Sequence, residues 1–444
     1  SREGSAAWGA RLAEGLNLSL RAHHRHLSDG VDNDTFNNTG FAGKLSHDWE
    51  GGSGALLLMG DLGSGGIPFS GSTPTPERHF STRTLMLASP WSWDLSPAWS
   101  LHLQASAQEN RYRFDDPQDA WSGHQFSRAR SLTLEGRIKG ALTSTLSLTA
   151  GTEWQGERIL SEGTSGIQID DAGNHHAAGW VEGVWSLNGL TLHAGLRADA
   201  YKGVDPALTP QLGASWLLSP HWKIRASWAH SFKAPLLIYQ INVWGLPNPD
   251  LKPERCRSWE TGLEHFARWG HLSVTFFDHH YDRMIDWVTV DPVAYSGQYQ
   301  NISQVDTRGL ETALSLQPLA RISLNLGHTY LYTRDQDTGK PLLRRPRHTF
   351  SAQLLYRHPW ATLSVGTRVV GSRPDVVYQG WTAVNETNPA YQTIQARITV
   401  PVGPVWSLFL SAENLLNHHY EAVLGYPSPG RRVLMGLTYS HEQP

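Results

Sequence analysis

Apolar residues alternate with small or polar residues along many short segments of the chain. Examples are LNLSLRA (residues 16–22), ISLNLGHTY (322–330) and TLSVGTRV (362–369). A period of two predicts β-strands that have one apolar face and one polar face. The polar faces do not fit the apolar core of a β-sandwich. They fit a barrel whose apolar face meets lipid and whose polar face meets a water-filled or plugged lumen.

Short turn signals divide these strands at regular intervals. They recur roughly every 30 to 50 residues, which leaves room for two spanning strands and one long loop and is too long for the four short strands of a propeller blade. Tryptophans lie close to many of these turns, as an aromatic belt at a membrane interface would place them. The expected turns are Gly15, 51–54, 96–97, Gly140, 188–189, 219–220, Gly270, Pro318, Pro359 and 403–404, and the belt comprises Trp49, Trp99, Trp185, Trp222, Trp269, Trp360 and Trp406.

Glycine- and proline-rich segments between the turns predict long loops that are candidates to face a ligand. The most informative loop connects an expected strand at 225–232 with another at 258–265. Its four prolines lack the backbone N–H that a β-ladder or a helix needs, so we expect a proline-stiffened loop on a β scaffold. The other expected loops are 28–40, 63–78, 115–123, 161–176, 283–301, 333–345 and 372–389.

The proline loop and the segments after it resemble TonB-dependent outer-membrane receptors. FKAP at 232–235 and NPDLKPE at 248–254 are followed, in the order of that family, by YQNISQVDTRGLE (299–311), RRPRH (344–348) and ENLLNHHYEAVLGYPSPGRR (413–432). Together the matches spread over about the last half of the chain. The residues that carry the resemblance include Phe232, Pro235, Asn248, Pro249, Leu251, Lys252, Pro253, Glu254, Gly309, Glu311, Pro429, Gly430 and Arg431.

The resemblance implies an all-β fold, a transmembrane antiparallel up-and-down β-barrel of about 21–22 strands with long extracellular loops and short periplasmic turns. Residues 1–444 would form this barrel domain in the outer membrane of a Gram-negative bacterium. The implied function is uptake of a metal chelate, such as a siderophore or cobalamin, energised by TonB through a plug. The alternative is a barrel that serves as a pore or as a structural scaffold without transport.

The strand count indicates that one strand and the plug come from elsewhere. Ten turns and ten loops give about 21 strands, whereas the family barrel has 22 and must close. An unpaired edge in lipid costs several kcal/mol for each backbone group. We therefore expect the plug and the first strand to come from another polypeptide or an N-terminal region absent here, with this strand pairing with both 5–14 and 431–439.

Composition excludes several other classes of protein. The 444 residues contain 37 Lys and Arg against 40 Asp and Glu, so no basic surface indicates nucleic-acid binding. The mean hydropathy is −0.39 and no apolar run approaches the ~20 residues of a spanning helix. The single cysteine, Cys256, rules out an intrachain disulfide. The absence of GxSxG, HExxH and P-loop motifs predicts a protein that is not an enzyme.

Four residues are candidates for contacts with the chelate. Tyr239 and Trp244 could supply flat aromatic contacts, while Arg344 and Arg345 could bind anionic groups. The alternative for the aromatic residues is that they only pack the loop. Haem receptors of the family carry a histidine between the two motifs of the proline loop, and this chain has none there, which disfavours haem.

Two clusters are candidates for metal binding. Asp29, Asp32 and Asp34 offer closely spaced hard oxygen ligands, which suit calcium, the one cofactor the sequence points to. By resemblance, calcium orders loops in about this region of cobalamin transporters; the alternative is a solvated acidic loop. His24 and His26 share one face of a strand and could form part of a metal site. The alternative is that they are solvated histidines at the end of a strand.

Overall fold

The computed structural model describes residues 1–28, 31–70, 73–120, 122–164, 166–241, 245–291, 296–379 and 382–441. The chain forms two compact units. Unit 1 comprises Ser1–Leu212, Ala229–Arg255 and Arg283–Ile302, and unit 2 comprises Gly213–Trp228, Cys256–Asp282 and Ser303–Pro444. Within the described ranges no helix is long and apolar enough to cross a membrane.

Strands make up nearly all of the described structure. From the N-terminus they are β1 (Arg2–Ala13), β2 (Leu16–Leu27), β3 (Phe36–Trp49), β4 (Gly52–Gly66), β5 (Phe69–Ser70), β6 (Thr73–Pro74), β7 (His79–Ser96), β8 (Trp99–Asp115), β9 (His124–Ala141), β10 (Leu146–Gly163), β11 (Gly166–Leu187), β12 (Leu190–Tyr201), β13 (Ala207–Ser219) and β14 (Trp222–Lys233). They continue as β15 (Glu254–Ala267), β16 (Gly270–Asp291), β17 (Ser296–Leu319), β18 (Ile322–Asp335), β19 (His348–His358), β20 (Ala361–Val370), β21 (Arg373–Gln379), β22 (Thr382–Asn388), β23 (Tyr391–Pro401), β24 (Trp406–Glu413), β25 (Glu421–Val423), β26 (Tyr426–Pro427) and β27 (Arg432–Tyr439), and the single helix among the described residues is α1 (Leu237–Ile241).

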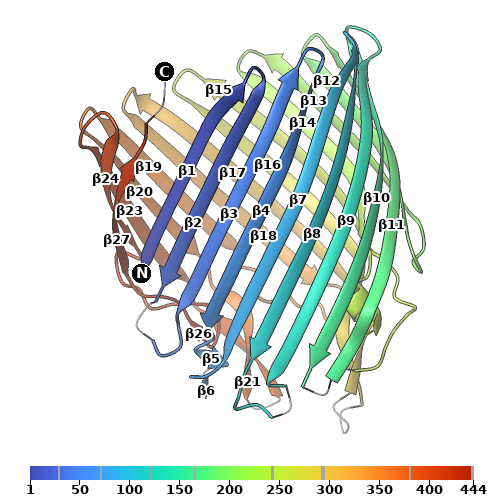
Figure 1. Cartoon of the computed structure of the whole chain (residues 1–444), viewed down its shortest axis with the longest axis vertical. Coiled ribbons are helices and arrows are strands. Elements are labelled where there is room, and N and C mark those ends of the chain that lie inside the picture. Colours follow the sequence, from blue (N-terminus) through green and yellow to red (C-terminus); the bar gives the residue numbers. More distant parts are fainter. Residues whose placement is uncertain are drawn as a thin grey trace. The chain divides into compact units, whose positions relative to one another are not determined.

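The strands follow an up-and-down order. In unit 1, successive strands from β1 to β4 and from β7 to β12 pair antiparallel, and β4 pairs with β7. Figure 1 shows β1–β4 and β7–β11 side by side, with short turns at the top of the view and long connections at the bottom. In unit 2, the order β17, β18, β19, β20, β23, β24, β27 is likewise antiparallel. Three small two-stranded ribbons occupy long connections: β5–β6, β21–β22 and β25–β26. The other described strands number twenty-one, as predicted.

Large apolar side chains lie on an exposed face of the sheet. In unit 1, Leu45 is paired with Leu18 and Leu56, and Leu58 is paired with Leu87. Leu56 and Leu58 are 49% and 42% exposed. The opposite face of the same strands carries many polar residues, such as Lys44 opposite Ser19. Apolar area of this extent is stable in lipid, so the alternation predicted from the sequence is confirmed.

Aromatic rings lie over glycines at several cross-strand pairs. Phe41 faces Gly60, Trp91 faces Gly54, Trp99 faces Gly140, Trp180 faces Gly151, and Phe409 faces Gly436. A Cβ atom added at any of these glycines would lie within 2.4 Å of the facing ring. The missing side chain therefore makes room for the ring, which in turn covers the glycine backbone.

Two predicted loops are instead paired strands. Residues 161–163 and 166–176 continue β10 and β11 as paired strands, in which Gly163 faces Gly166 and Glu157 faces Asn174. Most of residues 283–301 extends β16 and β17 in the same way. Glycine-rich composition indicated a loop there, but paired backbone groups extend the ladder past the last apolar residues. The proline loop also contains the short helix α1, which was not expected between Pro235 and Pro247.

Candidate ligand-binding site

The proline loop is fixed to the β16–β17 hairpin by residues of the sequence motif. Asn248 Nδ2 donates to the carbonyl of Tyr299 at 2.8 Å, and the Lys252 N–H donates to Asn301 Oδ1 at 2.8 Å. Glu254 accepts the N–H of Ile285 at 2.8 Å and forms an ion pair with Lys233 at 3.3 Å. Since these contacts lie within unit 1, the NPDLKPE residues act there as anchors of the loop.

Tyr239 is packed inside this loop. Its ring stacks on Tyr299 with 4.3 Å between centroids, and Trp287 meets Tyr299 edge-on at 5.2 Å. Aromatic pairs of this geometry stabilise a loop beyond the area they bury. The alternative that this aromatic residue packs the loop therefore accounts for its position, and Trp244 lies outside the described residues.

A cavity of about 720 Å³ lies beneath the FKAP segment in unit 1. One wall is formed by residues 230–238, which include Phe232, Lys233 and Pro235. The other is the polar face of β9–β12 with the start of β13. This wall includes Gln125, Ser127, Gln155, Glu157, Asn174, His176, Arg197, Asp199, Tyr201 and Thr209. The volume and the mixture of aromatic and hydrogen-bonding groups suit an organic ligand.

A charged network forms one wall of the cavity. Arg197 donates to Asp199 Oδ1 at 3.0 Å and to Glu153 Oε1 at 3.1 Å. His176 Nε2 lies 2.8 Å from Asp199 Oδ1, and the imidazole stacks on Tyr201 at 4.1 Å. The His176 Nδ1 atom is buried without a hydrogen bond and lies 3.5 Å from Glu153 Oε1. The guanidinium is thus paired with two carboxylates, so the network adds no net positive charge to the cavity.

Phe232 connects this network to the FKAP segment. Its ring meets Tyr201 edge-on with 6.0 Å between centroids. Both residues line the cavity, so two aromatic edges lie next to the hydrogen-bonding wall. An aromatic surface beside polar groups can bind the organic framework of a chelate while the polar groups fix its orientation.

Sequence motifs alone do not assign Arg197, Asp199 and Tyr201 to a site, or His176 to their network. Their signal was the period of two in LRADAY, which places Arg197, Asp199 and Tyr201 on one face of a strand. The partners of these residues lie on β10 and β11, more than twenty positions away in the sequence. Only the register of the strands brings them together.

Arg344 holds loops of unit 2 together. It has a φ of 59°, and its Nε donates to Asp375 Oδ1 at 2.8 Å. Asp375 also accepts the N–H groups of Val376 and Leu424, each at 2.9 Å, and the amide of Asn388 at 3.1 Å. Burial raises the pKa of Asp375, but the hydrogen bonds from Arg344 and these donors outweigh burial and hold the pKa below its ordinary value. Arg345 is exposed beside Arg344.

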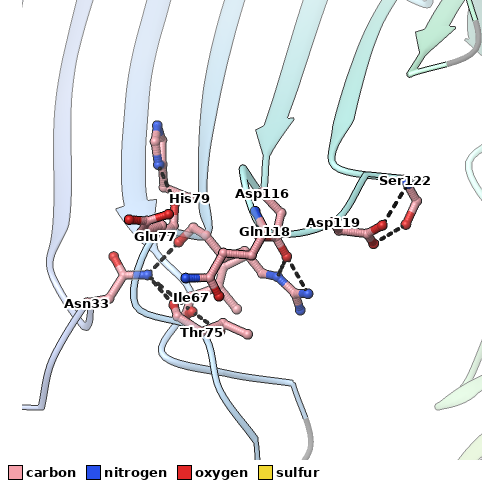
Figure 2. Close-up of polar contacts among 10 residues, drawn as sticks. Asn33, Ile67, Thr75, Glu77, His79, Asp116, Gln118, Asp119 and Ser122 are labelled. Carbon is pink, nitrogen blue, oxygen red and sulfur yellow. Dashed lines mark hydrogen bonds and ion pairs between the residues drawn. The ribbon is translucent and has the colours of Figure 1, made fainter.

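The predicted calcium loop contains a structural asparagine. Asn33 has a φ of 62°, and its Nδ2 donates to the carbonyls of Ile67, Thr75 and Arg78 (Figure 2). Asp34 accepts hydrogen bonds from Ser28 Oγ and the Val31 N–H. Asp32 is exposed, and Asp29 lies outside the described residues. In the described part of the chain, no group of three or more His, Cys, Asp or Glu residues could hold a metal ion.

His24 and His26 have partners on the neighbouring strand. His24 Nδ1 lies 2.8 Å from Thr39 Oγ1, and His26 Nδ1 lies 2.7 Å from Asn37 Oδ1. Each ring is therefore engaged across the β2–β3 pair in a side-chain hydrogen bond. This arrangement favours strand-end histidines over a metal site.

An exposed apolar face, a polar face that lines a cavity, and up-and-down strands with short turns at one end define a transmembrane β-barrel of the outer membrane. The chain belongs to the TonB-dependent receptors: the family described as "TonB dependent receptor-like, beta-barrel" matches residues 16–415. It is therefore a receptor-type outer-membrane barrel and not an enzyme.

Curated relatives are similar over part of their length. The vitamin B12 transporter BtuB of Vibrio cholerae serotype O1 is 27% identical over 294 residues, which is 65% of this chain and 46% of the relative. The iron-regulated outer membrane virulence protein of the same organism is 25% identical over 345 residues, 70% of this chain and 52% of the relative. The chain spans about half the length of these relatives.

Solved structures show the same fold over nearly the whole chain. The siderophore receptor PirA from Acinetobacter baumannii has a TM-score of 0.83 at 16% identity, covering 99% of this chain and 77% of that one. A mutant of the ferric enterobactin receptor PfeA from Pseudomonas aeruginosa has a TM-score of 0.83 at 17% identity, covering 98% and 77%. At these identities the likeness concerns the fold.

Proposed function

We propose that this chain is the barrel of an active-uptake receptor for a metal chelate, of the siderophore or cobalamin type, energised by TonB through a plug. The observation that carries the proposal is the cavity beneath the FKAP segment, where Phe232 and Tyr201 adjoin a wall of hydrogen-bonding groups. Its residues lie at the long-loop ends of their strands, on the side from which an external ligand arrives. The names of the relatives add vitamin B12 and iron uptake as the classes to test first.

The test is uptake by cells that lack their own chelate receptors. Cells expressing the chain together with a plug should accumulate labelled cyanocobalamin or a ferric siderophore, and deletion of TonB should abolish accumulation. Tyr201→Ala should lower uptake at least several-fold because it removes an aromatic wall of the cavity. The matched control is Tyr330→Ala, since Tyr330 is 37% exposed and faces Leu310 and His348 on the apolar side of the sheet.

Two outcomes would contradict the proposal. Uptake that is unchanged without TonB would indicate a passive pore. Absence of uptake for every chelate, with a correctly inserted barrel, would favour the structural scaffold.

We also propose that the plug and one further strand are supplied by an N-terminal region or by another polypeptide. The support is the count of twenty-one strands outside the small ribbons in the described chain, against the 22 of the family barrel. The test uses cysteines introduced at Ala10 and Met435 in a Cys256→Ser background. A disulfide between them in a barrel without any added segment would overturn the proposal, whereas crosslinks of each cysteine to the added segment would support it.

A further inference from the structure

A group of arginines lies on the apolar face of unit 1, beyond its last leucines. We call these residues the arginine band: Arg83, Arg111, Arg113, Arg128, Arg130 and Arg158. Arg83 of β7 is directly opposite Arg111 of β8, which is directly opposite Arg128 of β9. Arg130 of β9 faces Arg158 of β10. Like charges directly opposite one another destabilise a sheet, so this arrangement needs an explanation.

The register fixes the face and the end of the sheet at which the band lies. Arg83 is opposite Leu62, and the next residues of β7 on the same face are Leu85 and Leu87, which are 38% and 44% exposed. Arg83 is near the first residue of β7, where the strand leaves a long connection (Figure 1). In this family the long connections are extracellular. The arginine band therefore borders the lipid-facing apolar surface on the side of the outer leaflet.

Nearby carboxylates neutralise only part of the band. Glu109 accepts Arg111 and Arg130, each at 2.7 Å, which leaves one of the two positive charges uncompensated. Asp115 pairs with Arg113, and Asp171 pairs with Arg158. Within the described ranges, neither Arg83 nor Arg128 has a hydrogen bond or an ion pair. Three carboxylates thus pair with four of the six guanidinium groups.

A cavity of about 430 Å³ opens beside the band. Its lining includes Arg83, Arg111 and Arg113 together with the polar residues Thr39, Ser64 and Ser81. Guanidinium groups bind phosphate through paired N–H donors, and hydroxyl groups add further hydrogen bonds. Cationic and hydroxyl donors above exposed leucines match a lipid that has a phosphorylated headgroup and apolar chains.

We propose that the arginine band binds the phosphate groups of a phosphorylated lipid in the outer leaflet. The phosphates lie between Arg83, Arg111 and Arg128, where they relieve the repulsion across β7–β9. The acyl chains lie along the exposed leucines of the apolar face, such as Leu85 and Leu87. The lipid thereby acts as an external counter-ion that the chain does not supply.

Unit 2 shows that such a band is not a general property of these strands. At the corresponding ends of β18 and β19, the apolar face carries His328, Tyr330, Phe350 and His348. His328 and His348 stack on each other with 5.4 Å between ring centroids. An aromatic surface of this kind suits the membrane interface. Nearer the long connection, the same face carries Arg308 opposite Tyr332 and Arg334 opposite Asp306, so neither arginine lies opposite another arginine. We therefore expect lipid phosphate to be retained at unit 1.

The test measures retention of lipid A, a phosphorylated glycolipid, by the purified full chain in a neutral detergent. Native mass spectrometry should detect bound lipid A, and raising the ionic strength should reduce the bound fraction because partly exposed charges are screened. The double variant Arg83→Gln with Arg128→Gln should retain lipid A several-fold less. The matched control is Arg368→Gln, since Arg368 lies opposite Ser351 and Thr393 on the polar face of unit 2.

Three results would overturn the proposal. They are equal retention by the double variant, equal retention of dephosphorylated lipid A, and full displacement of lipid A by inorganic phosphate at a similar concentration, which would indicate a site for free anions. Folding of each variant is checked by its resistance to unfolding in detergent. If the double variant fails to fold, the proposal is still tested with the unaltered chain, by the salt dependence of lipid A retention and by the retention of dephosphorylated lipid A.

Discussion

The long connections of the two units are anchored by different arrangements of the same chemistry. In unit 1, Asn33 and Asp116 hold separate segments: Asn33 donates to three carbonyls, and Asp116 accepts Arg78 Nε at 2.7 Å. In unit 2, the contacts gather on β21: Asp375 receives donors from Arg344, Asn388 and Leu424, and Arg373 donates to the carbonyls of Pro389, Glu421 and Ala422. The comparison teaches that hydrogen bonds of the same kinds can be distributed over separate segments or concentrated on one strand.

The largest expected effect is that of Asp375→Ala. Asp375 is fully buried, and its loss leaves Arg344 and two N–H groups without their acceptor and leaves Asn388 with only the Glu421 carbonyl. Removing one partner from a buried pair costs about 3–5 kcal/mol, and we expect the lower end because Arg344 is 42% exposed. Hydrogen exchange should show loss of protection in β21–β22 and β25–β26. Unchanged protection, with exposed Asp337→Ala as the control, would show that Asp375 is not a principal anchor of these ribbons.

The same anchor should depend on pH in a defined direction. Because the pKa of Asp375 is lowered in the folded loops, its carboxylate adds stability above its unfolded pKa, and this stability is lost as the pH falls toward the folded value. Protection of β21–β22 should therefore be constant from neutral pH down to the ordinary aspartate range, near pH ~4, and decline below it. Asp375→Asn should remove this decline. A loss of protection between pH ~7 and ~5 would assign the dependence to another group.

Asp116→Ala should have an intermediate effect. Asp116 is 5% exposed and holds the guanidinium of Arg78, which is 19% exposed. Loss of a charged hydrogen-bond acceptor costs about 1–3 kcal/mol. Proteolysis should accelerate around residues 116–123 while Asn33 still holds the β5–β6 connection. If cleavage spread equally into residues 67–78, the anchor of unit 1 would not be distributed.

Asn33 should give the smallest effect. Asn33→Gly preserves the positive φ but removes the side-chain amide, whereas Asn33→Ala loses both. We expect Asn33→Gly to cost about 0.5–1.5 kcal/mol, the contribution of ordinary hydrogen bonds, and Asn33→Ala to cost more. Hydrogen exchange at residues 64–78 is the measurement. Equal values for the two variants would show that the backbone conformation contributes nothing.

Most of the fold could be predicted from the sequence because both of its signals are local. A period of two defines strands, and Gly or Pro marks turns, so the positions at Gly15, 188–189 and 403–404 lie at strand ends. The hairpin within 161–176 was not predicted because glycine and polar residues dominate its composition, although its strands are paired.

The candidate site could be predicted only in part. The FKAP segment, noted in the sequence as a family motif, lines the cavity, whereas Asn248 and Glu254 hold the loop. Arg344, expected to meet a ligand, is engaged with Asp375. The Arg197 network and the arginine band each depend on the register between strands, which short-range patterns do not specify. Ligand contacts by Tyr239, Trp244 or Arg345, and calcium binding at the acidic loop, stay predictions.

The rings that lie over glycines restrict how this sequence can change over generations. At Gly60 and Gly436 a new side chain would collide with Phe41 and Phe409, so a mutation there is acceptable only after the ring has been lost. Loss of the ring alone uncovers the glycine backbone but causes no collision. Substitutions should therefore occur in a fixed order, first the ring and then the glycine. Among descendants of this chain, substitutions at each glycine and at the ring that faces it should be correlated. This correlation would identify which strands are neighbours.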